Sequence, residues 1–388
     1  MRRIVPLLLV LITMTVEGQR RRAASAPAPE PLDKAGGGPL ANLPPAQLDE
    51  FRIGRAEFIN KRTVSGGLGP VFNRASCVEC HLSPAVGGGD LDGQVRFREV
   101  EPGGPVLQTR AIGPRDGSPY QFRPEAPPPE SRISRHRPPP LFGLGLVEAT
   151  DDATFIALAQ AQAARNDGTA GRVALVHNPQ TGTKTVGKFG WKARIATLLE
   201  FSGDAYLNEL GVTSPDFPDE ICPSGNCDEL RFNPSPGLND GGEDIRAVAD
   251  FMRFLARSRP ITADVLAGVA IFQRIGCAAC HVPELQTGAN PNPALDRVTY
   301  APYSDFLLHD MGFLGDGLTQ GDAGPREMRT PPLWGIGARQ GHLHDSRGVN
   351  NFESTISFHD GQGKAASDRY KALTRTEQTR LLSFLRSL

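Results

Sequence analysis

Cys77-Val78-Glu79-Cys80-His81 is the stretch that decides the fold, and the pattern recurs at Cys277-Ala278-Ala279-Cys280-His281. Two cysteines three positions apart can each form a thioether to one porphyrin, and the adjoining histidine can then bind the iron. The sequence therefore predicts two covalently attached c-type haems. Zinc is the alternative, but paired zinc-binding motifs usually lie about 15–20 residues apart. These two motifs lie 200 residues apart (277 minus 77).

The two cysteines outside the motifs are Cys222 and Cys227, in the segment Cys-Pro-Ser-Gly-Asn-Cys. Pro223 and Gly225 favour a tight loop between them, and an oxidising compartment would close such a pair into a disulfide. A redox-active or metal-binding pair is the alternative, but no further cluster of ligand residues adjoins it. We therefore predict a structural disulfide.

The N-terminus has the composition of an export signal. Arg2 and Arg3 precede an apolar run from Ile4 to Thr13, and small and polar residues follow. The run is shorter than the roughly 20 apolar residues that span a bilayer, and it fits a signal peptide. We expect residues 1–24 to be that signal, residues 25–45 to be a disordered linker, and the mature protein to be periplasmic. An uncleaved membrane anchor is the alternative.

The overall composition gives no support for two classes of partner. The 388 residues carry a net charge of −1 at pH 7, which gives no electrostatic reason to expect nucleic acid or an anionic membrane surface. The length allows two domains with sizeable cores. The 43 glycines and 34 prolines indicate many ordered loops, as in small cytochrome c domains, where the haem supplies much of the core.

Three landmarks recur in the same order around the two motifs. Such self-similarity indicates an internal repeat. The pairs are Gly54–Phe58 with Gly268–Phe272 before each motif, Arg137–Gly145 with Arg329–Gly337 after it, and the amphipathic segments Ile245–Ser258 and Thr376–Leu388 at the end of each half.

The predicted fold is accordingly mainly α, a tandem of two cytochrome c-like domains with long Gly/Pro-rich loops, each enclosing one covalent haem. The domains are expected at residues 46–260 and 261–388, because Pro260 stops the helix before it. Residues 90–135 and 150–186 have no counterpart of similar length in the second half. We expect these insertions to shape access to the first haem, with an exposed helix from Asp151 to Ala164.

His81 and His281 are the expected proximal ligands, one for each iron. The residue on the opposite face decides whether an iron transfers electrons or binds a substrate. In the second half His359 is the candidate, whereas the corresponding stretch of the first half, residues 197–205, has neither His nor Met. We therefore expect a six-coordinate second haem and a more open first haem. Met311 is the alternative sixth ligand, followed by Met328.

The other histidines have simpler interpretations, because neutral imidazole has many structural uses. His309 and His344 are expected to be structural or to contact haem propionates. His177 and His342 are expected on the surface, and His136 in a loop among arginines and prolines.

Further segments resemble the di-haem oxidoreductases of the peroxidase or thiol-oxidoreductase type. These are relatives of bacterial di-haem cytochrome c peroxidases and of the tryptophan tryptophylquinone maturation enzyme. The resemblance extends over nearly all of residues 48–388. Besides the two haem motifs, it depends on Pro139–Glu148, Tyr303–Gly312, Arg329–Gly335 and His344-Asp345.

The resemblance implies roles for three residues. His359 falls where the peroxidases carry the methionine of the electron-transfer haem, which would make the second haem bis-histidine with a lower potential. Trp191 resembles the tryptophan that mediates electron transfer between the haems. Glu209 resembles the distal acid/base of the peroxidatic haem. A calcium between the domains is also implied, although no acidic cluster with clear spacing supports it.

The implied reaction is reduction of hydrogen peroxide with electrons from a redox protein of the cytochrome or cupredoxin type. Cleavage of a bound peroxide requires a proton to move between its oxygens, and a carboxylate in a dry pocket can do this. Glu200 or Phe201 stands where the relatives carry glutamine, and no distal histidine is evident. Both departures fit a constitutively open haem or a different substrate, such as a protein or thiol partner. A pure electron carrier with two six-coordinate haems is the alternative.

Overall fold

The computed structural model describes residues 36–89, 95–99, 106–124, 126, 132–257, 265–345, 347 and 351–388. The predicted signal peptide and the predicted join at Pro260 lie outside these residues. None of the described helices has the length and apolar composition needed to cross a membrane.

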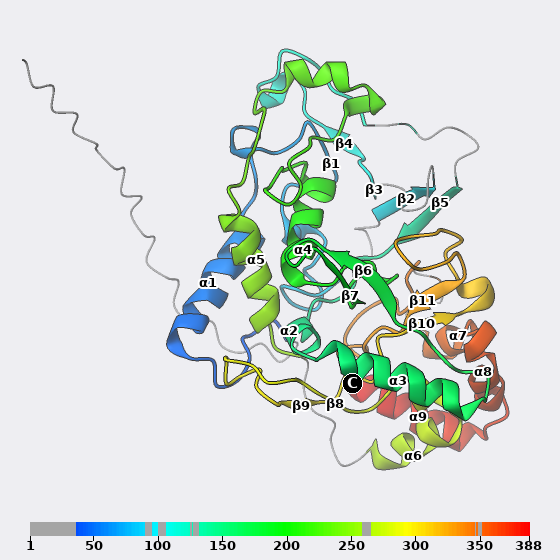
Figure 1. Ribbon diagram of the computed structural model, residues 1–388. Helices are drawn as coiled ribbons and strands as arrows, with labels where there is room; N and C mark the ends of the chain where they lie inside the picture. Colours follow the sequence, from blue (N-terminus) through cyan, green and yellow to red (C-terminus); the bar gives the residue numbers. More distant parts are fainter. Residues whose placement is uncertain are drawn as a thin grey trace, which may run out of the picture.

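The first helix pair is α1 (Pro45–Ile59) and α5 (Glu243–Phe254), which lie side by side (Figure 1). Proline occupies the first turn of α1, where its missing N–H has no cost. Gly54 lets the helices approach closely, because a Cβ there would lie 2.0 Å from the carbonyl oxygen of Ala247. Phe58, one turn further on, packs against Phe251 with ring centroids 4.8 Å apart.

The second helix pair, α6 (Leu266–Arg274) and α9 (Arg375–Ser387), makes equivalent contacts. A Cβ at Gly268 would lie 2.4 Å from the carbonyl oxygen of Arg380. Phe272 packs against Phe384 at 5.4 Å between ring centroids. Thr374 begins α9 with a reciprocal capping box that includes Glu377, an arrangement that satisfies two N-terminal donors.

The Pro-Pro-Leu landmark also makes the same contacts in both halves. Gly143 at the start of α2 (Leu144–Glu148) and Gly335 both have a positive φ, 69° and 73°. Two residues later, a Cβ at Gly145 would lie 1.8 Å from the carbonyl oxygen of Arg253, and one at Gly337 would lie 2.0 Å from that of Arg386. Each landmark is therefore held against the last helix of its own half.

Two hydrophobic cores follow from these pairs, and they are unequal. The second core consists of residues between 265 and 388 alone. The first, built around Phe58 and Phe251, also takes in Leu285, Phe306 and Trp334 from the second half. The two halves are therefore packed against each other.

Short antiparallel strands, which the sequence did not predict, fill the connections. One sheet has the order β3-β2-β5, and the other pairs are β1 with β4, β6 with β7, β8 with β9, and β10 with β11. Their bounds are Val71–Phe72 (β1), Val95–Glu99 (β2), Val106–Leu107 (β3), Arg110–Ala111 (β4), Arg132–His136 (β5), Ala174–Asn178 (β6), Thr183–Gly187 (β7), Leu285–Gln286 (β8), Thr299–Tyr300 (β9), Leu308–Asp310 (β10) and Glu327–Arg329 (β11). The remaining helices are α3 (Asp152–Arg165), α4 (Leu198–Ala205), α7 (Phe352–Ser357) and α8 (Lys364–Lys371).

The inserted segment 150–186, which was expected to shape access to the first haem, contacts the second half. Its helix α3 and hairpin β6–β7 lie over the second half (Figure 1). Gln162 of α3 donates through Nε2 to the carbonyl of Ala279, at 3.1 Å, inside the second motif. Arg172 and Leu308 exchange backbone hydrogen bonds of 3.0 and 2.9 Å.

Two further segments are held in place, residues 38–40 by backbone hydrogen bonds and residues 222–227 by a disulfide. Within the predicted linker, Leu40 N–H donates to Phe254 O at 2.7 Å, and Ala256 N–H donates to Gly38 O at 2.8 Å. Residues 38–40 are therefore an ordered extension along the end of α5, not part of a free linker. The structure also contains a disulfide between Cys222 and Cys227.

Candidate functional site

The two cysteine motifs adopt the same local structure. Each begins with a short 3₁₀ turn, Cys77–Glu79 or Cys277–Ala279. His81 N–H donates to Cys77 O at 3.0 Å, and His281 N–H donates to Cys277 O at 2.9 Å. The turn therefore brings both thiols and the imidazole of each motif into one neighbourhood, as covalent haem attachment requires.

Each motif histidine has one ring nitrogen engaged. His81 Nδ1 lies 2.8 Å from Gly88 O, and His281 Nδ1 lies 2.8 Å from Tyr303 O. A carbonyl oxygen only accepts, so Nδ1 carries the proton and Nε2 has the free lone pair that binds a metal. Burial lowers the pKa of both imidazoles to about 4, which keeps them in the neutral, ligating form.

An aromatic ring fixes each histidine from the helix before it. The ring of Phe58 lies 6.1 Å from that of His81 at 59°, and the ring of Phe272 lies 6.3 Å from that of His281 at 57°. The glycine–phenylalanine landmark therefore serves the same purpose twice: the glycine allows the helix crossing, and the phenylalanine orients the histidine.

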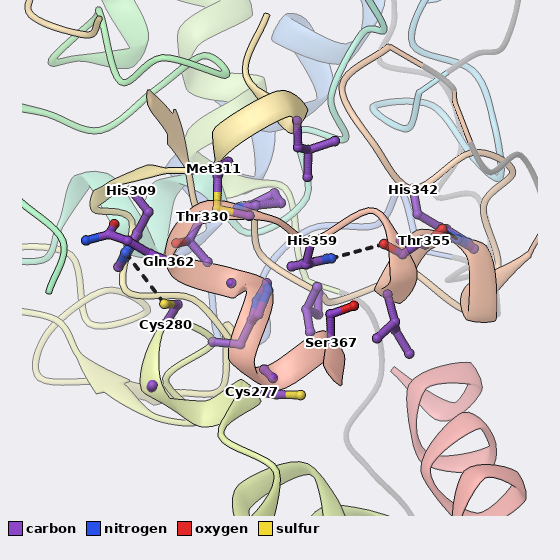
Figure 2. A pocket seen from close by; sticks show the side chains of 18 of the residues that line it. Cys277, Cys280, His309, Met311, Thr330, His342, Thr355, His359, Gln362 and Ser367 are labelled. Atoms are coloured by element: carbon purple, nitrogen blue, oxygen red, sulfur yellow. Dashed lines mark hydrogen bonds between the residues drawn. The ribbon is translucent and has the colours of Figure 1, made fainter. Parts of the chain in front are cut away.

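A large cavity adjoins the second motif (Figure 2), with about 1330 Å³ of empty space including its mouth. Cys277, Cys280 and His281 line one side, and most other walls are aliphatic or aromatic side chains. Two thiols, one free imidazole nitrogen and apolar walls are the features that suit a porphyrin with covalent attachment. The residues at this site therefore fit the predicted haem.

His359 lies across this cavity from His281, with ring centroids 6.5 Å apart. Its Nδ1 lies 3.0 Å from Thr355 O in α7 (Figure 2), which leaves Nε2 free. If the two free nitrogens held one metal ion with bonds of about 2 Å each, the two ring centroids would lie about 6 Å apart, which is close to the observed distance. Met311 and Met328 line the same cavity.

His309 and Asp305 form a buried pair beside the second motif. His309 Nε2 lies 2.9 Å from Asp305 Oδ2, and its Nδ1 lies 3.6 Å from Cys280 Sγ. Burial alone would lower the pKa of His309, but hydrogen bonds to Asp305 and Cys280 raise it to about 10. Among the described residues this is the one cluster of three or more metal-binding side chains. With a single carboxylate it does not resemble the oxygen-rich sites that hold calcium.

Glu209 lies beside the segment that enters the first motif. It belongs to a π-helical turn, Tyr206–Leu210, that continues α4, and such turns occur frequently at functional sites. Asn73, four residues before Cys77, donates from Nδ2 to Glu209 Oε2 at 2.9 Å and from its backbone N–H to Glu209 O at 2.7 Å. Burial raises the pKa of Glu209 to about 7, against the opposing effect of the Asn73 hydrogen bond.

Trp191 lies between the two equivalent Arg-x-Pro-Pro-Leu landmarks. Its indole Nε1–H donates to Arg137 O of the first landmark at 2.8 Å. Its carbonyl accepts from Arg329 N–H of the second landmark, also at 2.8 Å. The side chain is buried and lines the second cavity. Trp191 is thus connected to both halves.

Two histidines that the sequence placed in a loop or on the surface are buried near this junction. His136, expected in a loop, is in β5, and its Nε2 lies 3.0 Å from Asp316 Oδ2. His342, expected on the surface, stacks on Phe352 with ring centroids 4.2 Å apart. The sequence carried no local signal for either, because Asp316 is 180 residues from His136.

Comparison with known proteins gives the chain a family. The family model described as "Di-haem oxidoreductase, putative peroxidase" matches residues 130–388. Among curated proteins, none matches. Two similar solved structures are hydrazine synthase from Kuenenia stuttgartiensis (15% identity, 100% of both chains covered, TM-score 0.41) and a MauG-like protein associated with microbial copper homeostasis (17% identity, 90% of this chain and 92% of that one covered, TM-score 0.39). The family match covers two thirds of the chain, and the protein belongs to the di-haem oxidoreductase family.

Proposed function

We propose that the protein is a periplasmic di-haem c-type oxidoreductase that reduces hydrogen peroxide. Electrons from a redox protein of the cytochrome or cupredoxin type enter at the haem of Cys277, Cys280 and His281. They pass Trp191 and reach the haem of Cys77, Cys80 and His81. The observation that carries this proposal is the contrast between the motifs: His359 lies opposite His281, whereas the segment entering the first motif is bonded to the acid Glu209.

The architecture that we propose is a tandem of two cytochrome c-like domains, residues 46–260 and 261–388. The support is the set of equivalent contacts in the two halves. Gly54 and Gly268 allow the two helix crossings, and Phe58 and Phe272 contact the two motif histidines.

Glu209 is the proposed acid/base of the first site. The haem, when bound, supplies the iron that binds and reduces the peroxide. A carboxylate with a pKa of about 7 can take a proton from one oxygen and return it to the other near neutral pH. The hydrogen bonds from Asn73 fix its position, and Asn73 is itself held because its Oδ1 accepts from the backbone N–H and the hydroxyl of Thr109.

His359 is the proposed sixth ligand of the second haem. We expect His359→Gly to convert one low-spin ferric signal to high spin in electron paramagnetic resonance, because the free nitrogen opposite His281 is removed. Met311→Leu removes the alternative ligand from the same cavity and is expected to leave the spectrum unchanged. If Met311→Leu changes the spectrum and His359→Gly does not, Met311 is the sixth ligand.

Electron paramagnetic resonance of the purified resting protein, combined with a peroxide assay, tests the function as a whole. We expect one low-spin signal and one high-spin signal, together with peroxide-dependent oxidation of a reduced cytochrome well above free-haem background. Two low-spin signals and background turnover would instead establish an electron carrier. A high-spin signal without peroxide turnover would point to another oxidisable partner at the first site.

A further inference from the structure

Arg329 is a buried cation in the second cavity. Its side chain lines the space beside Cys277, Cys280 and His281, and the residue is 4% exposed. No carboxylate among the described residues forms an ion pair with it. A charge removed from water is expensive unless a counter-charge lies close to it. Its guanidinium lies over the ring of Phe306, 5.4 Å from the centroid. Among the described residues, Arg329 is therefore a buried cation without a carboxylate in direct contact.

The contacts of Arg329 leave part of its guanidinium free. Nε donates to Gly190 O at 2.6 Å and Nη1 donates to Thr330 O at 3.1 Å. Among the described residues, Nη2 has no hydrogen-bond partner. The nearby acid Asp305 partly opposes the effect of burial on the pKa of Arg329, but it forms no ion pair with it. Its carboxylate instead accepts from Gln162 Nε2 at 2.7 Å and contacts His309 Nε2 at 2.9 Å.

Another buried cation of the same region shows the contrast. Lys192, adjacent to Trp191, is 1% exposed. Its Nζ lies 2.7 Å from Asp316 Oδ1 and 2.8 Å from Gly324 O. Lys192 thus has a carboxylate in direct contact, whereas Arg329, which lines the second cavity, has none among the described residues.

A second nitrogen in the same cavity has no hydrogen-bond partner. His344 is 3% exposed and lines the cavity, and the nearest carboxylate oxygen recorded for its Nε2, Asp345 Oδ2, lies 3.8 Å away, too far for a hydrogen bond. Its ring centroid is 6.2 Å from that of Trp191, and Arg329 donates its backbone N–H to Trp191 O. The guanidinium of Arg329 is also bonded next to Trp191, because its Nε donates to Gly190 O. Arg329 and His344 therefore both lie near Trp191.

We propose that Arg329 and His344 form a carboxylate-binding subsite for the propionate groups of the second haem. The guanidinium supplies the charge and a free donor, and the imidazole supplies a further nitrogen. The carboxylate edge of the haem is thereby held next to Trp191, the residue proposed to pass electrons onward. This inference rests on the proposed function, because it requires a haem in the second cavity.

The test is a redox titration of purified holoprotein carrying Arg329→Gln, with Arg329→Lys as the charge-conserving variant. Covalent haem content is first measured by the pyridine haemochrome method, and the two midpoint potentials then by spectroelectrochemistry between pH 6 and pH 8. Arg326, which is exposed and paired with Asp310 at 3.0 Å, provides the control Arg326→Gln.

We expect Arg329→Gln to lower the potential of the second haem and to make it pH-dependent. Loss of the cation leaves a buried carboxylate uncompensated, which favours ferric over ferrous iron and raises the pKa of that carboxylate. Arg329→Lys and Arg326→Gln should stay close to the original potential, and the first haem should be unaffected in all three variants.

An unchanged second potential in Arg329→Gln, with two haems bound, would overturn the inference while leaving the proposed function intact. If that variant yields no holoprotein, His344→Leu replaces it, and the expected result is a smaller shift in the same direction. No shift in His344→Leu would then overturn the subsite. A wild-type protein without covalent haem would overturn the proposed function instead.

Discussion

The two haem motifs have the same backbone turn but different surroundings. In both, the histidine Nδ1 is bonded to a carbonyl and a phenylalanine ring lies about 6 Å away. Beyond that shared frame, the second motif has His359 at 6.5 Å across an apolar cavity. The segment before the first motif is instead bonded to Glu209. In the proposed function, the same scaffold therefore holds an electron-transfer haem in the second half and a substrate haem in the first.

The halves also differ in what holds them together. The first half contributes α3 and the β6–β7 hairpin, which cover the second half, and Arg172 pairs with Glu327 and Asp322 across the junction. Buried Lys192 pairs with Asp316 at the same junction. Such contacts favour a fixed separation between the two motifs, as the proposed electron transfer through Trp191 would need.

The largest expected effect comes from removing one motif at a time. Cys77→Ser/Cys80→Ser should abolish peroxide turnover and leave a single low-spin haem, because the proposed substrate site is lost. Cys277→Ser/Cys280→Ser should leave a high-spin haem that still reacts with peroxide but accepts no electrons from the reduced donor. Peptide mass spectrometry locates the remaining haem, and stopped-flow spectroscopy measures both reactions.

If only the variant that keeps the second motif reacted with peroxide, the roles of the two motifs would be the opposite of those proposed. If both double variants kept the same turnover, the two motifs would not have different roles. In either case the contrast between His359 and Glu209 would not determine where the reaction takes place.

Glu209→Gln gives the next largest effect, a loss of about 10²–10⁴-fold in peroxide turnover, which is the usual contribution of a general acid or base. The chain offers a matched control in Glu220. That carboxyl is also held by an asparagine, with Asn233 Nδ2 3.0 Å from its Oε1, and burial raises its pKa to about 8. Glu220→Gln should leave turnover unchanged.

The pH profile gives the same prediction a second readout. Because the pKa of Glu209 is raised to about 7, the carboxylate that accepts the first proton is lost below that pH. Turnover should therefore rise with pH through about 7, and the rise should vanish in Glu209→Gln. A profile that is flat between pH 5 and pH 8 in the wild type would remove Glu209 from the reaction.

Local patterns in the sequence predicted the repeated helices and haem motifs, but they predicted few of the contacts between the two halves. Gly54 and Gly268 could be paired because their surroundings repeat, and the helix predicted from Asp151 to Ala164 is close to the observed α3, Asp152–Arg165. The packing of that helix on the second motif depends on Gln162 and Asp305, 143 residues apart, and no local pattern reports such a contact. The short strands were missed because strands of two to five residues have almost no periodicity.

The two tryptophans of the chain provide the third comparison. Both are buried, but Trp191 donates from Nε1 to Arg137 O, whereas Trp334 Nε1 has no partner. Trp191→Phe should slow the reoxidation of the second haem after peroxide is mixed with the reduced protein, since the proposed route is interrupted. Trp334→Phe should not, because Trp334 belongs to the second landmark, where it corresponds to Phe142 of the first. Equal rates in both variants, measured by stopped flow, would show that electrons do not require Trp191.

The smallest expected effect concerns the helix crossings, and it tests whether the two halves are held in the same way. Alanine is usually favoured over glycine inside a helix by about 1 kcal/mol. At Gly54 and Gly268 the added Cβ would lie 2.0 and 2.4 Å from a backbone carbonyl oxygen, and overpacking of this kind costs about 1–3 kcal/mol. Both alanine variants should therefore lower the free energy of unfolding in guanidinium titrations. Gly113→Ala, where the nearest atom is 3.8 Å away, is the control without a clash.

Gly54→Ala should perturb the spectrum of the first haem and Gly268→Ala that of the second, because each crossing positions the phenylalanine beside one histidine. If both variants perturbed the same haem, the two helix pairs would not be independent supports.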